Sequence, residues 1–301
     1  MTRDYPDVVL DPLREAYEIE RGKASVEALA EYDAIFTTIG DAWPAKAFEG
    51  GPHRCAILAN FGVGYSHIDA DAAARAGVAV TNTPGATTEP TADVALMLML
   101  MSCRRAGAAE RMVRRGEWSG WVPFGPEIGM ALRGRTLGVV GLGRIGEALA
   151  KRAEVLGMTV IYTARSEKER PGWVPLETLL ERADVVALCV PGGPGTKHLI
   201  GREQLSAMKP TAHLVNISRG DVVDEAALAA ALEAGEIAGA GLDVYEGEPE
   251  IHPGLFREDV VLLPHIGTAD RGVREEMGLM VVANLLAHAR GEPLPNPVND
   301  P

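Results

Sequence analysis

Short apolar runs alternate along this chain with segments in which apolar residues recur every three or four positions. Runs of this kind are typical of strands buried in a parallel sheet, and the wider spacing is typical of the helices that cover such a sheet. The alternation extends from about residue 34 to residue 263. It predicts an α/β protein built from parallel sheets.

The runs fall into an early and a later group, separated by a helix at residues 91–105 that is apolar on nearly all sides. Such a helix is buried, in a core or at a domain boundary. Helices and strands alternate in both groups, which predicts two doubly wound parallel-sheet domains. The expected strands are residues 34–38, 55–59, 78–82, 136–140, 158–163, 183–190, 212–218, 239–245 and 260–263, and the other expected helices are residues 68–76, 147–157, 204–208, 224–234 and 274–289.

One strand of the later group runs directly into a glycine-rich turn and a helix. Gly141 allows a tight turn, Gly143 lets the backbone approach a pyrophosphate, and Gly146 lets helix and strand pack closely. The helix N-terminus presents free N–H groups to phosphates, and Arg144 adds a positive charge. The segment predicts a dinucleotide site rather than a merely structural turn, and it consists of Gly141, Leu142, Gly143, Arg144, Ile145 and Gly146.

Composition and charge narrow the class of protein. The chain has 301 residues, of which 47% are hydrophobic and 24% charged, as in ordinary globular proteins of two domains. A net charge of −13 argues against binding to nucleic acid or to an anionic membrane. Cys55, Cys103 and Cys189 have neither disulfide nor metal-ligand spacing, residues 1–11 are polar, and no apolar run approaches the ~20 residues of a membrane helix. We therefore expect a cytoplasmic protein with no metal site.

Chemistry-bearing residues follow the last three expected strands: Arg219, Glu248 and His265. In doubly wound sheets ligands bind beyond the carboxyl ends of the strands, so the three would converge on one cleft. An Arg fork matches a carboxylate, and a His with a carboxylate neighbour suits acid–base catalysis. Beside a nicotinamide, this set describes reduction of a 2-oxo acid. Taken singly, Arg219 could be a surface ion-pair residue, Glu248 a solvated carboxylate and His265 a core histidine.

Several ordered motifs resemble the D-isomer-specific 2-hydroxyacid dehydrogenase family. The resemblance implies a Rossmann cofactor domain at residues 93–270 and a flavodoxin-like substrate domain at residues 1–92 and 271–301. The sequence departs from the family at Thr2-Arg3, which stands at the very start, so the first strand is expected to be clipped or absent; residues 191–195 are also richer in glycine than the usual loop. The matching motifs are residues 60–69, 81–84, 141–146, 216–220, 241–249 and 264–267.

The resemblance also implies roles for individual residues. Arg219 would bind and polarise the substrate, His265 would donate the proton and Glu248 would hold His265. The loop amides of Val63 and Gly64 would take the substrate carboxylate. The cofactor contacts implied outside the glycine turn, with Asp243 and the Ile217 carbonyl on the nicotinamide carboxamide, are Thr91, Ala164, Arg165, Ser166, Val190, Pro191, Thr196, Ile217, Ser218, Asp243, His265 and Gly267.

The end of the second strand of the cofactor domain bears on the choice of cofactor. Sites that prefer NAD place an Asp or Glu there for the ribose 2′-hydroxyl. No carboxylate stands at this strand's tip, and Arg165 and Ser166, helped by Lys168, could hold a 2′-phosphate. Glu167 and Glu169 oppose that assignment. We favour NADP, with NAD possible, and the Tyr-x-x-Arg ending resembles the glyoxylate/hydroxypyruvate reductase branch of the family.

The sequence thus predicts an NADPH-dependent reductase of a small 2-oxo acid, with glyoxylate or hydroxypyruvate first. Two alternatives stay open: an NAD-linked dehydrogenase of another D-2-hydroxy acid such as D-3-phosphoglycerate, and a non-catalytic dinucleotide sensor like the family's corepressors. A phosphorylated substrate would require Lys or Arg after Asn60, where residues 65–67 offer at most one titratable cation. The helix at residues 91–105, with Trp118 and Trp121, suggests a homodimer.

Overall fold

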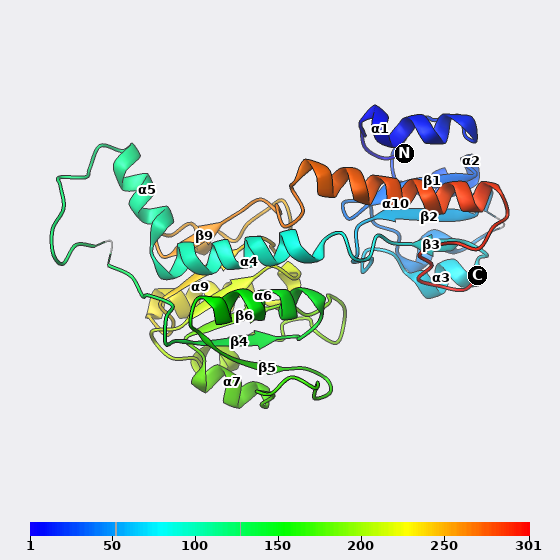
Figure 1. The fold of residues 1–301 in the computed structure, drawn as a ribbon. Coiled ribbons are helices and arrows are strands. Elements are labelled where there is room, and N and C mark those ends of the chain that lie inside the picture. The colour runs from blue at the N-terminus through cyan, green and yellow to red at the C-terminus, as the bar shows by residue number, and fades with distance from the viewer. Residues whose placement is uncertain (52, 127) are drawn as a thin grey trace. The chain divides into compact units, whose positions relative to one another are not determined.

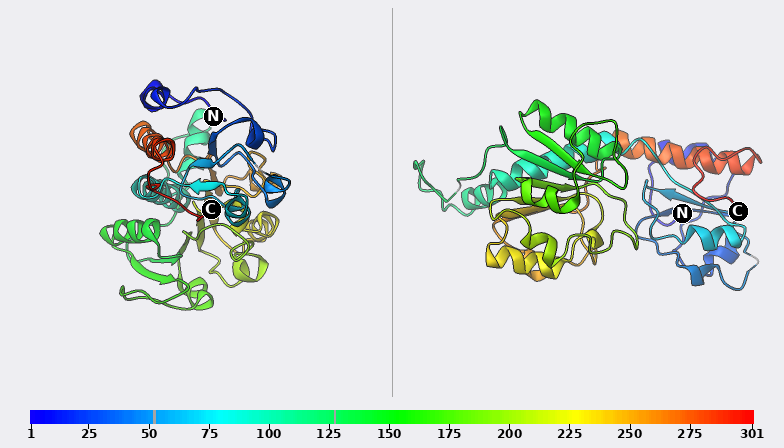
Figure 2. Two further views of the ribbon diagram at one scale, coloured as in Figure 1. Left: turned by 90° about the vertical axis from the view of Figure 1, so that its right-hand side faces the viewer. Right: turned by 90° about the horizontal axis from the view of Figure 1, so that it is seen from below.

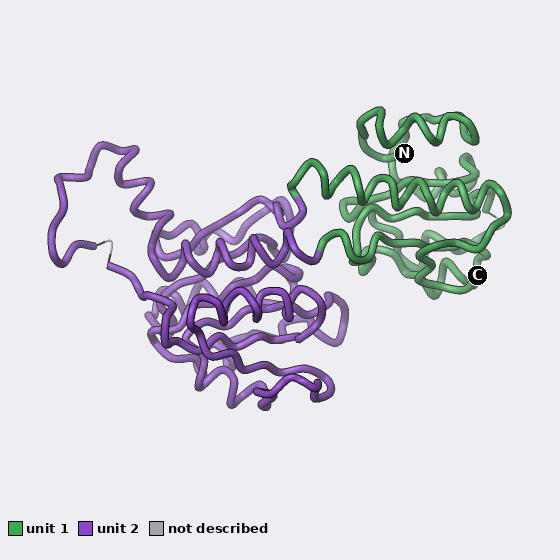
Figure 3. The backbone as a smooth tube through the Cα atoms, in the orientation of Figure 1, with its two compact units in different colours: residues 1–87, 269–301 green, residues 88–268 purple. Residues whose placement is uncertain are grey.

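The chain divides into two compact units, which Figure 3 colours separately. The structure is a computed structural model that describes residues 1–51, 53–126 and 128–301. Unit 1 combines the two ends of the chain, and unit 2 is its continuous middle. Unit 1 comprises residues 1–87 and 269–301, and unit 2 comprises residues 88–268.

Both junctions come a few residues earlier than the sequence pattern places them. At the first junction the cause is helix α4 (Thr88–Cys103), which begins three residues before the expected start at residue 91. Pro90 lies in its first turn, where a proline costs no intrahelical hydrogen bond, so it does not delay the helix. No helix in the described part of the chain is both long and apolar enough to span a bilayer.

Unit 1 is built on a small parallel sheet with helices on both faces (Figure 1). Its elements are α1 (Asp7–Leu10), α2 (Ala28–Glu31), β1 (Ala34–Thr38), β2 (Ile57–Phe61), α3 (Ala70–Arg75), β3 (Ala79–Thr81) and α10 (Arg271–Ala289), with 3₁₀ turns at Asp11–Glu15 and Ala45–Phe48. The strands lie in the order β1–β2–β3, all parallel. Along β2, Leu58 packs in the cluster that contains Trp43, whereas Ile57 packs in the cluster under α10, so both faces of the sheet are covered.

The two chain ends lie along the edges of this sheet. The N–H group of Thr2 donates to the carbonyl of Phe36 in β1, at 3.1 Å. At the other edge the N–H group of Val298 donates to the carbonyl of Val80 in β3, at 2.9 Å, and the Asn299 side chain accepts the N–H group of Val80 at 2.7 Å. The C-terminal tail, for which the sequence predicts no regular structure, is therefore fastened to β3.

Unit 2 contains six parallel strands in the order β5–β4–β6–β7–β8–β9 (Figure 1). Its elements after α4 are α5 (Ala106–Arg114), β4 (Thr136–Val140), α6 (Arg144–Val155), β5 (Thr159–Thr163), α7 (Leu176–Arg182), β6 (Val185–Leu188), α8 (Arg202–Ser206), β7 (His213–Asn216), α9 (Glu225–Ala234), β8 (Gly239–Leu242) and β9 (Val260–Leu262), with 3₁₀ turns at Gly220–Val222 and Pro253–Leu255. The strand order reverses at β4, between its neighbours β5 and β6. Such a reversal is where ligands bind in open α/β sheets.

Helices cover both faces of the sheet in unit 2, with α4 and α6 on one face and α7, α8 and α9 on the other (Figure 2). The alternation of side chains along the central strand β6 shows how the faces differ. Val186 and Leu188 join the cluster under α7, α8 and α9, whereas Val185 and Ala187 join the cluster under α4 and α6. Burial on both faces explains why the strands read as continuous apolar runs, and the doubly wound arrangement expected from them is confirmed.

A buried histidine joins α4 to this sheet. His213, the first residue of β7, is 6% exposed, and its Nδ1 lies 2.8 Å from the Oγ atom of Ser102 in α4. Burial lowers the pKa of His213 to about 4, the charge of Arg105 acts in the same direction, and Asp259 opposes it. The folded protein therefore holds this imidazole neutral.

His213 is expected to make the fold sensitive to mild acid. The pKa of His213 is about 6.5 in the unfolded chain and about 4 in the folded protein. The contribution of His213 to the free energy of unfolding is therefore complete above pH 6.5, and about 3 kcal/mol of it is lost as the pH falls towards 4. Thermal unfolding of the wild type and His213→Gln should therefore differ in slope between pH 6.5 and 4, with the variant less pH-dependent. Parallel pH profiles would contradict this assignment.

Candidate active site

Two glycines of the turn after β4 are required by packing inside the protein. Gly141 has a φ of +96°, and a Cβ atom there would lie 2.8 Å from the carbonyl carbon of Cys189. A Cβ atom on Gly146 would lie 2.4 Å from the carbonyl oxygen of Gly141. The first glycine allows the turn, and the last lets α6 approach β4.

Gly143 differs from both, because packing does not require it. Apart from its chain neighbours, nothing described would lie within 4 Å of a Cβ atom there. Gly143 is the N-cap of α6, and no side chain caps the helix, so the first N–H groups are available to an anion. Leu142 is buried, Ile145 packs against the core and Arg144 is exposed. The turn therefore fits the pyrophosphate of a dinucleotide.

Strand β5 lies next to β4, the strand that leads into the glycine turn, and residues 164–166 follow β5. Ala164 is half-buried, and Arg165 and Ser166 are exposed. Arg165 forms no ion pair within the part of the chain that the structure describes, although Glu167 and Glu169 are near in sequence and exposed. Its guanidinium is therefore available to a phosphate.

The loop after β6 begins beside the same turn. Val190 and Pro191 follow the Cys189 backbone against which Gly141 packs. The hydroxyl of Thr196 donates to the Pro191 carbonyl at 2.7 Å and closes the loop. Of the cofactor contacts expected here, Val190 and Pro191 thus adjoin the glycine turn, and Thr196 holds the loop in shape.

The turn after β7, which carries Arg219, is shaped by Asn216. The Asn216 Oδ1 atom accepts the N–H group of Ser218 at 3.0 Å and its hydroxyl at 2.7 Å, and Nδ2 donates to the carbonyl of Arg219 at 2.9 Å. Gly220 then packs flat on the segment after β8, since a Cβ atom there would lie 1.8 Å from the carbonyl carbon of Tyr245. The Arg219 turn and the segment after β8 are therefore held together.

Arg219 is a cation in a partly desolvated position. Burial lowers its pKa, and the negative charges of Glu248 and Asp221 act in the opposite direction. Arginine nevertheless remains charged in proteins. One of its N–H groups donates to the Ser218 carbonyl at 2.6 Å, and the others make no hydrogen bond to the described residues, so they can form a fork on a ligand oxygen.

Glu248 and His265 form a hydrogen-bonded pair. Glu248 Oε2 lies 2.9 Å from His265 Nδ1, and Oε1 accepts the N–H group of Tyr245 at 3.0 Å. Burial alone would raise the pKa of Glu248, but the hydrogen bond and charge of His265, the Tyr245 N–H group and the charge of Arg219 together lower it. An ionised Glu248 favours the proton on Nδ1, which leaves Nε2 as the nitrogen that can contact a substrate.

Asp243 holds the loop on which His265 lies. Its two carboxylate oxygens accept the N–H groups of Ile266 and Gly267, at 2.7 and 2.8 Å. His265 itself has a φ of +53°, a left-handed conformation that costs a non-glycine residue about 1–2 kcal/mol. Burial raises the pKa of Asp243, and the two N–H donors oppose that rise. Thr91 adds a third tie, from its hydroxyl to the Gly267 carbonyl at 3.3 Å.

In unit 1, the loop after β2 turns its carbonyl groups inward. Asn60 donates to the carbonyls of Gly62 and Gly64, each at 3.1 Å, and Asn82 donates to the carbonyl of Val63 at 2.9 Å. The N–H groups of Val63 and Gly64 donate to none of the described residues. Two consecutive free N–H groups form a site for an anion.

Some residues that shape the site were not predicted to do so. The sequence motifs include Asn60, Asn82, Asn216 and Gly220, but their hydrogen bonds and close contacts follow from loop paths that the sequence does not specify. A possible signal was the position of each asparagine at or next to the end of a strand, where a side-chain amide can replace missing backbone partners. Asp243 was expected to contact the cofactor, and the structure shows it holding the His265 loop. Its carboxylate oxygens have further lone pairs, so the contact with the cofactor stays a prediction.

The difference between the glycines gives a test of the turn. Gly146→Ala should destabilise unit 2 by about 1–3 kcal/mol, because the added Cβ atom meets the Gly141 carbonyl. Gly143→Ala should unfold close to the wild-type temperature and yet bind NADPH or NADH more weakly. Calorimetry and nucleotide titration measure the two effects. Unchanged nucleotide affinity in Gly143→Ala would contradict the close backbone approach.

The chain is similar to known 2-hydroxyacid dehydrogenases. The family model for the D-isomer specific 2-hydroxyacid dehydrogenase NAD-binding domain matches residues 96–267. A glyoxylate reductase from Thermococcus litoralis is 44% identical, covering 99% of this chain and 96% of the relative. A glyoxylate reductase from Pyrococcus horikoshii is 42% identical, covering 99% of this chain and 95% of the relative.

Solved structures show the same similarity over the full chain. An NADPH-dependent glyoxylate/hydroxypyruvate reductase from Sinorhizobium meliloti, in complex with NADP and malonate, has a TM-score of 0.89 at 37% identity and covers 99% of this chain and 95% of its own. A glyoxylate reductase from Paecilomyes thermophila has a TM-score of 0.87 at 34% identity and covers 96% and 94%. The resemblance seen in the sequence motifs is confirmed. This chain belongs to the D-isomer specific 2-hydroxyacid dehydrogenase family.

Proposed function

We propose that this protein reduces a small 2-oxo acid, glyoxylate or hydroxypyruvate, to the corresponding 2-hydroxy acid with NADPH as its preferred reductant. Its relatives carry the names glyoxylate reductase and glyoxylate/hydroxypyruvate reductase. The observation that carries the proposal is the 2.9 Å hydrogen bond between His265 and Glu248, on the same unit as Arg219 and the glycine turn. A held proton donor and a fixed cation are what reduction of a carbonyl beside a carboxylate requires.

The side chains divide the work of the reaction. Bound NADPH would supply the hydride. Arg219 binds the substrate and polarises its carbonyl, because its unpaired N–H groups stabilise the negative charge that develops on the oxygen. His265 donates a proton from Nε2 to that oxygen. Glu248 holds the orientation of the His265 ring through the hydrogen bond to Nδ1, and Asp243 fixes the loop that carries the ring.

The loop of unit 1 provides for the substrate carboxylate. Its free N–H groups at Val63 and Gly64 suit a carboxylate oxygen, and Asn60 and Asn82 keep the neighbouring carbonyls turned away. We assign residues 1–87 and 269–301 to substrate binding and residues 88–268 to the cofactor.

The preference for NADP is supported by the segment after β5. Arg165 is exposed and without an ion pair among the described residues, and Ser166 beside it offers a hydroxyl group. Together they can hold a 2′-phosphate by charge-assisted hydrogen bonds. A related reductase binds NADP. Because the cysteines Cys55, Cys103 and Cys189 are all free thiols, we place the enzyme in the reducing cytoplasm.

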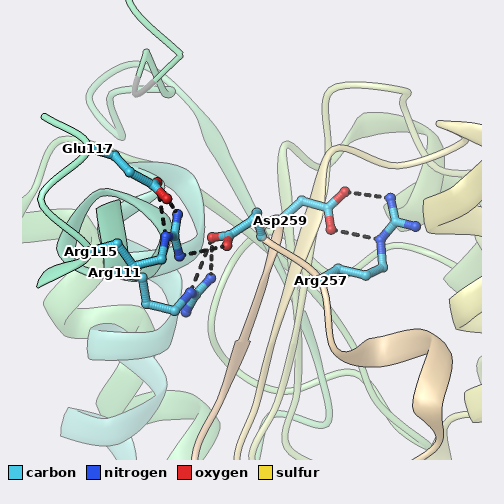
Figure 4. Close-up of polar contacts among 6 residues, drawn as sticks. Arg111, Arg115, Glu117, Arg257 and Asp259 are labelled. Carbon is cyan, nitrogen blue, oxygen red and sulfur yellow. Dashed lines mark hydrogen bonds and ion pairs between the residues drawn. The ribbon is translucent and has the colours of Figure 1, made fainter. Parts of the chain in front are cut away.

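We also propose that the protein is a homodimer that pairs through an arm formed by α5 and residues 115–126. Trp118, Trp121 and Phe124 on this arm are 58%, 79% and 91% exposed. Ion pairs fix the base of the arm, because Glu258 is 2.7 Å from Arg111 and 3.3 Å from Arg115. Figure 4 shows the pair that Arg115 also forms with Glu117, at 2.9 Å. Exposed aromatic side chains on a fixed support mark an interaction surface.

The reductase proposal is tested by following absorbance at 340 nm with NADPH or NADH against glyoxylate, hydroxypyruvate, pyruvate and phenylpyruvate. We expect rapid oxidation of NADPH with the two small acids. A preference for NADH would overturn the role given to Arg165 and Ser166. Tight nucleotide binding with no turnover of any acid would favour a dinucleotide sensor instead.

Replacing His265 isolates its role as proton donor. His265→Ala should lower kcat by about 10²–10⁴-fold, because proton transfer to the developing alkoxide is lost, while NADPH binding is retained. His288→Ala, which removes an imidazole from unit 1, is the matched control and should keep wild-type turnover. Near wild-type turnover in His265→Ala would refute the assignment.

The dimer is tested on the arm. Trp121→Ser combined with Phe124→Ser should shift sedimentation from dimer to monomer, because both side chains lose apolar area that only a partner can cover. Phe256→Ser, at a residue of unit 2 that is 66% exposed outside the arm, should leave the oligomeric state unchanged. A wild-type monomer, or a dimer that persists in the double variant, would refute the proposal.

A further inference from the structure

The segment after β5 leaves Tyr162 and returns to it. The N–H group of Tyr162 donates to the carbonyl of Gly172 at 2.9 Å, and the Tyr162 carbonyl accepts the N–H group of Val174 at 2.9 Å. Gly172 has a φ of +103°, and a Cβ atom there would lie 2.8 Å from the Val160 carbonyl oxygen, so the returning chain lies close against β5. Residues 164–171 between these contacts form a closed loop that carries Arg165 and Ser166.

The side chain of Tyr162 holds the middle of this loop. The side chain is fully buried, and its hydroxyl oxygen accepts the N–H group of Lys168 at 2.9 Å. The same hydroxyl donates to the carbonyl of Arg170 at 2.9 Å, with the carbonyl of Lys168 at 3.2 Å. One phenol group therefore satisfies backbone groups on both sides of residue 169, in a loop that forms neither helix nor strand.

A second tie joins the loop to the helix of the glycine turn. The Arg170 side chain is 18% exposed and forms ion pairs with Glu147, at 3.0 Å, and with Glu154, both on α6. Two ion pairs that share one mostly buried arginine hold it more firmly than a single exposed pair does. The loop is thus fastened from β5 by Tyr162 and from α6 by Arg170.

We propose that Tyr162 and Arg170 are positioning residues for cofactor choice: they hold Arg165 and Ser166 where a 2′-phosphate is recognised, and so determine the preference for NADPH over NADH. The inference rests on the proposed use of NADPH and adds two residues that do not themselves touch the cofactor. Neither has contacts with Arg219, Glu248 or His265 in the described structure, so they act on cofactor binding and not on proton transfer.

The physical reason is the cost of ordering an exposed loop. An exposed arginine on a mobile loop loses backbone and side-chain freedom when it binds a phosphate. Where the loop is already held, that loss has occurred on folding, and more of the charge-assisted interaction appears as affinity. NADH lacks the 2′-phosphate and gains nothing from the ordering of Arg165. Loosening the loop should therefore weaken NADPH binding selectively.

The test measures binding, not turnover. Dissociation constants for NADPH and NADH would be measured by calorimetry on the whole protein and on Tyr162→Phe, Arg170→Gln and Arg165→Ala. Tyr162→Phe removes only the hydroxyl group, and it should weaken NADPH binding about three- to tenfold while NADH changes less than twofold. Arg170→Gln should act in the same direction. In an Arg165→Ala background, Tyr162→Phe should change the NADPH-to-NADH ratio less than twofold further, because the two residues act through one interaction.

Hydrogen exchange of the ligand-free protein gives an independent readout. Tyr162→Phe should speed exchange in peptides that cover residues 164–172 and leave the rest of unit 2 unchanged. Tyr17→Phe is the matched control, because it removes a phenol that donates to the Leu285 carbonyl at 2.9 Å in unit 1, and it should alter neither exchange in this loop nor the affinity ratio.

The outcomes separate this inference from the proposed function. Two binding results would overturn the positioning role. One is equal weakening of NADPH binding and NADH binding in Tyr162→Phe. The other is an unchanged NADPH-to-NADH affinity ratio in Tyr162→Phe when Arg165→Ala abolishes the preference for NADPH. Unchanged exchange at residues 164–172 would also overturn it. An unchanged NADPH-to-NADH ratio in Arg165→Ala would instead refute recognition of the 2′-phosphate by Arg165, and the role of Tyr162 and Arg170 in cofactor choice with it. The exchange result would then report only whether Tyr162 holds the loop.

Discussion

The parallel direction of the strands is the constraint on which the candidate site depends. All six strands of unit 2 run the same way, so the carboxyl ends of β4, β7, β8 and β9 lie at the same end of the sheet. The glycine turn, Arg219, Asp243 and His265 each follow one of these ends. They are far apart in sequence, and none makes a local motif with another. If any of these strands were antiparallel, the residue that follows it would lie at the opposite end of the sheet.

Assembly at the carboxyl end of the sheet brings charged groups out of water, and the structure compensates the carboxylates of Asp243 and Glu248. Asp243 is 1% exposed, a position that would be costly for an unpaired carboxylate, and two N–H groups satisfy it. Glu248 is likewise paired on both oxygens. These bonds also explain how His265 keeps its left-handed backbone conformation, since the residues that follow it are held by Asp243. The same hydrogen bonds therefore compensate the buried carboxylates and position His265.

The sequence was sufficient to predict the strands, because a strand buried on both faces is mostly apolar along its length. The expected strand at residues 136–140 coincides with β4, whereas the one at residues 183–190 is longer than β6, since Cys189 and Val190 leave the strand to pack beside Gly141. Two helices of unit 2, α5 and α7, were not predicted from the sequence, although the shorter helices α3 and α8 were. The catalytic candidates were predicted from strand ends alone. The contacts of Tyr162 were not, because they join a hydroxyl group to backbone groups of an irregular loop.

The three glycines of the turn show how a binding constraint can be distinguished from a folding constraint. Gly141 and Gly146 have neighbours that exclude a side chain, so the fold itself requires them. Gly143 has no such neighbour among the described residues, so packing does not require a glycine there, and the close approach of its backbone to a dinucleotide stays a prediction. The amides of Val63 and Gly64 follow the same logic, since their loop is held by Asn60 and Asn82 and yet leaves these two donors without a partner in the described structure. Where a loop is firmly fastened, a group left without an internal partner is best explained by a partner that arrives with the substrate or the cofactor.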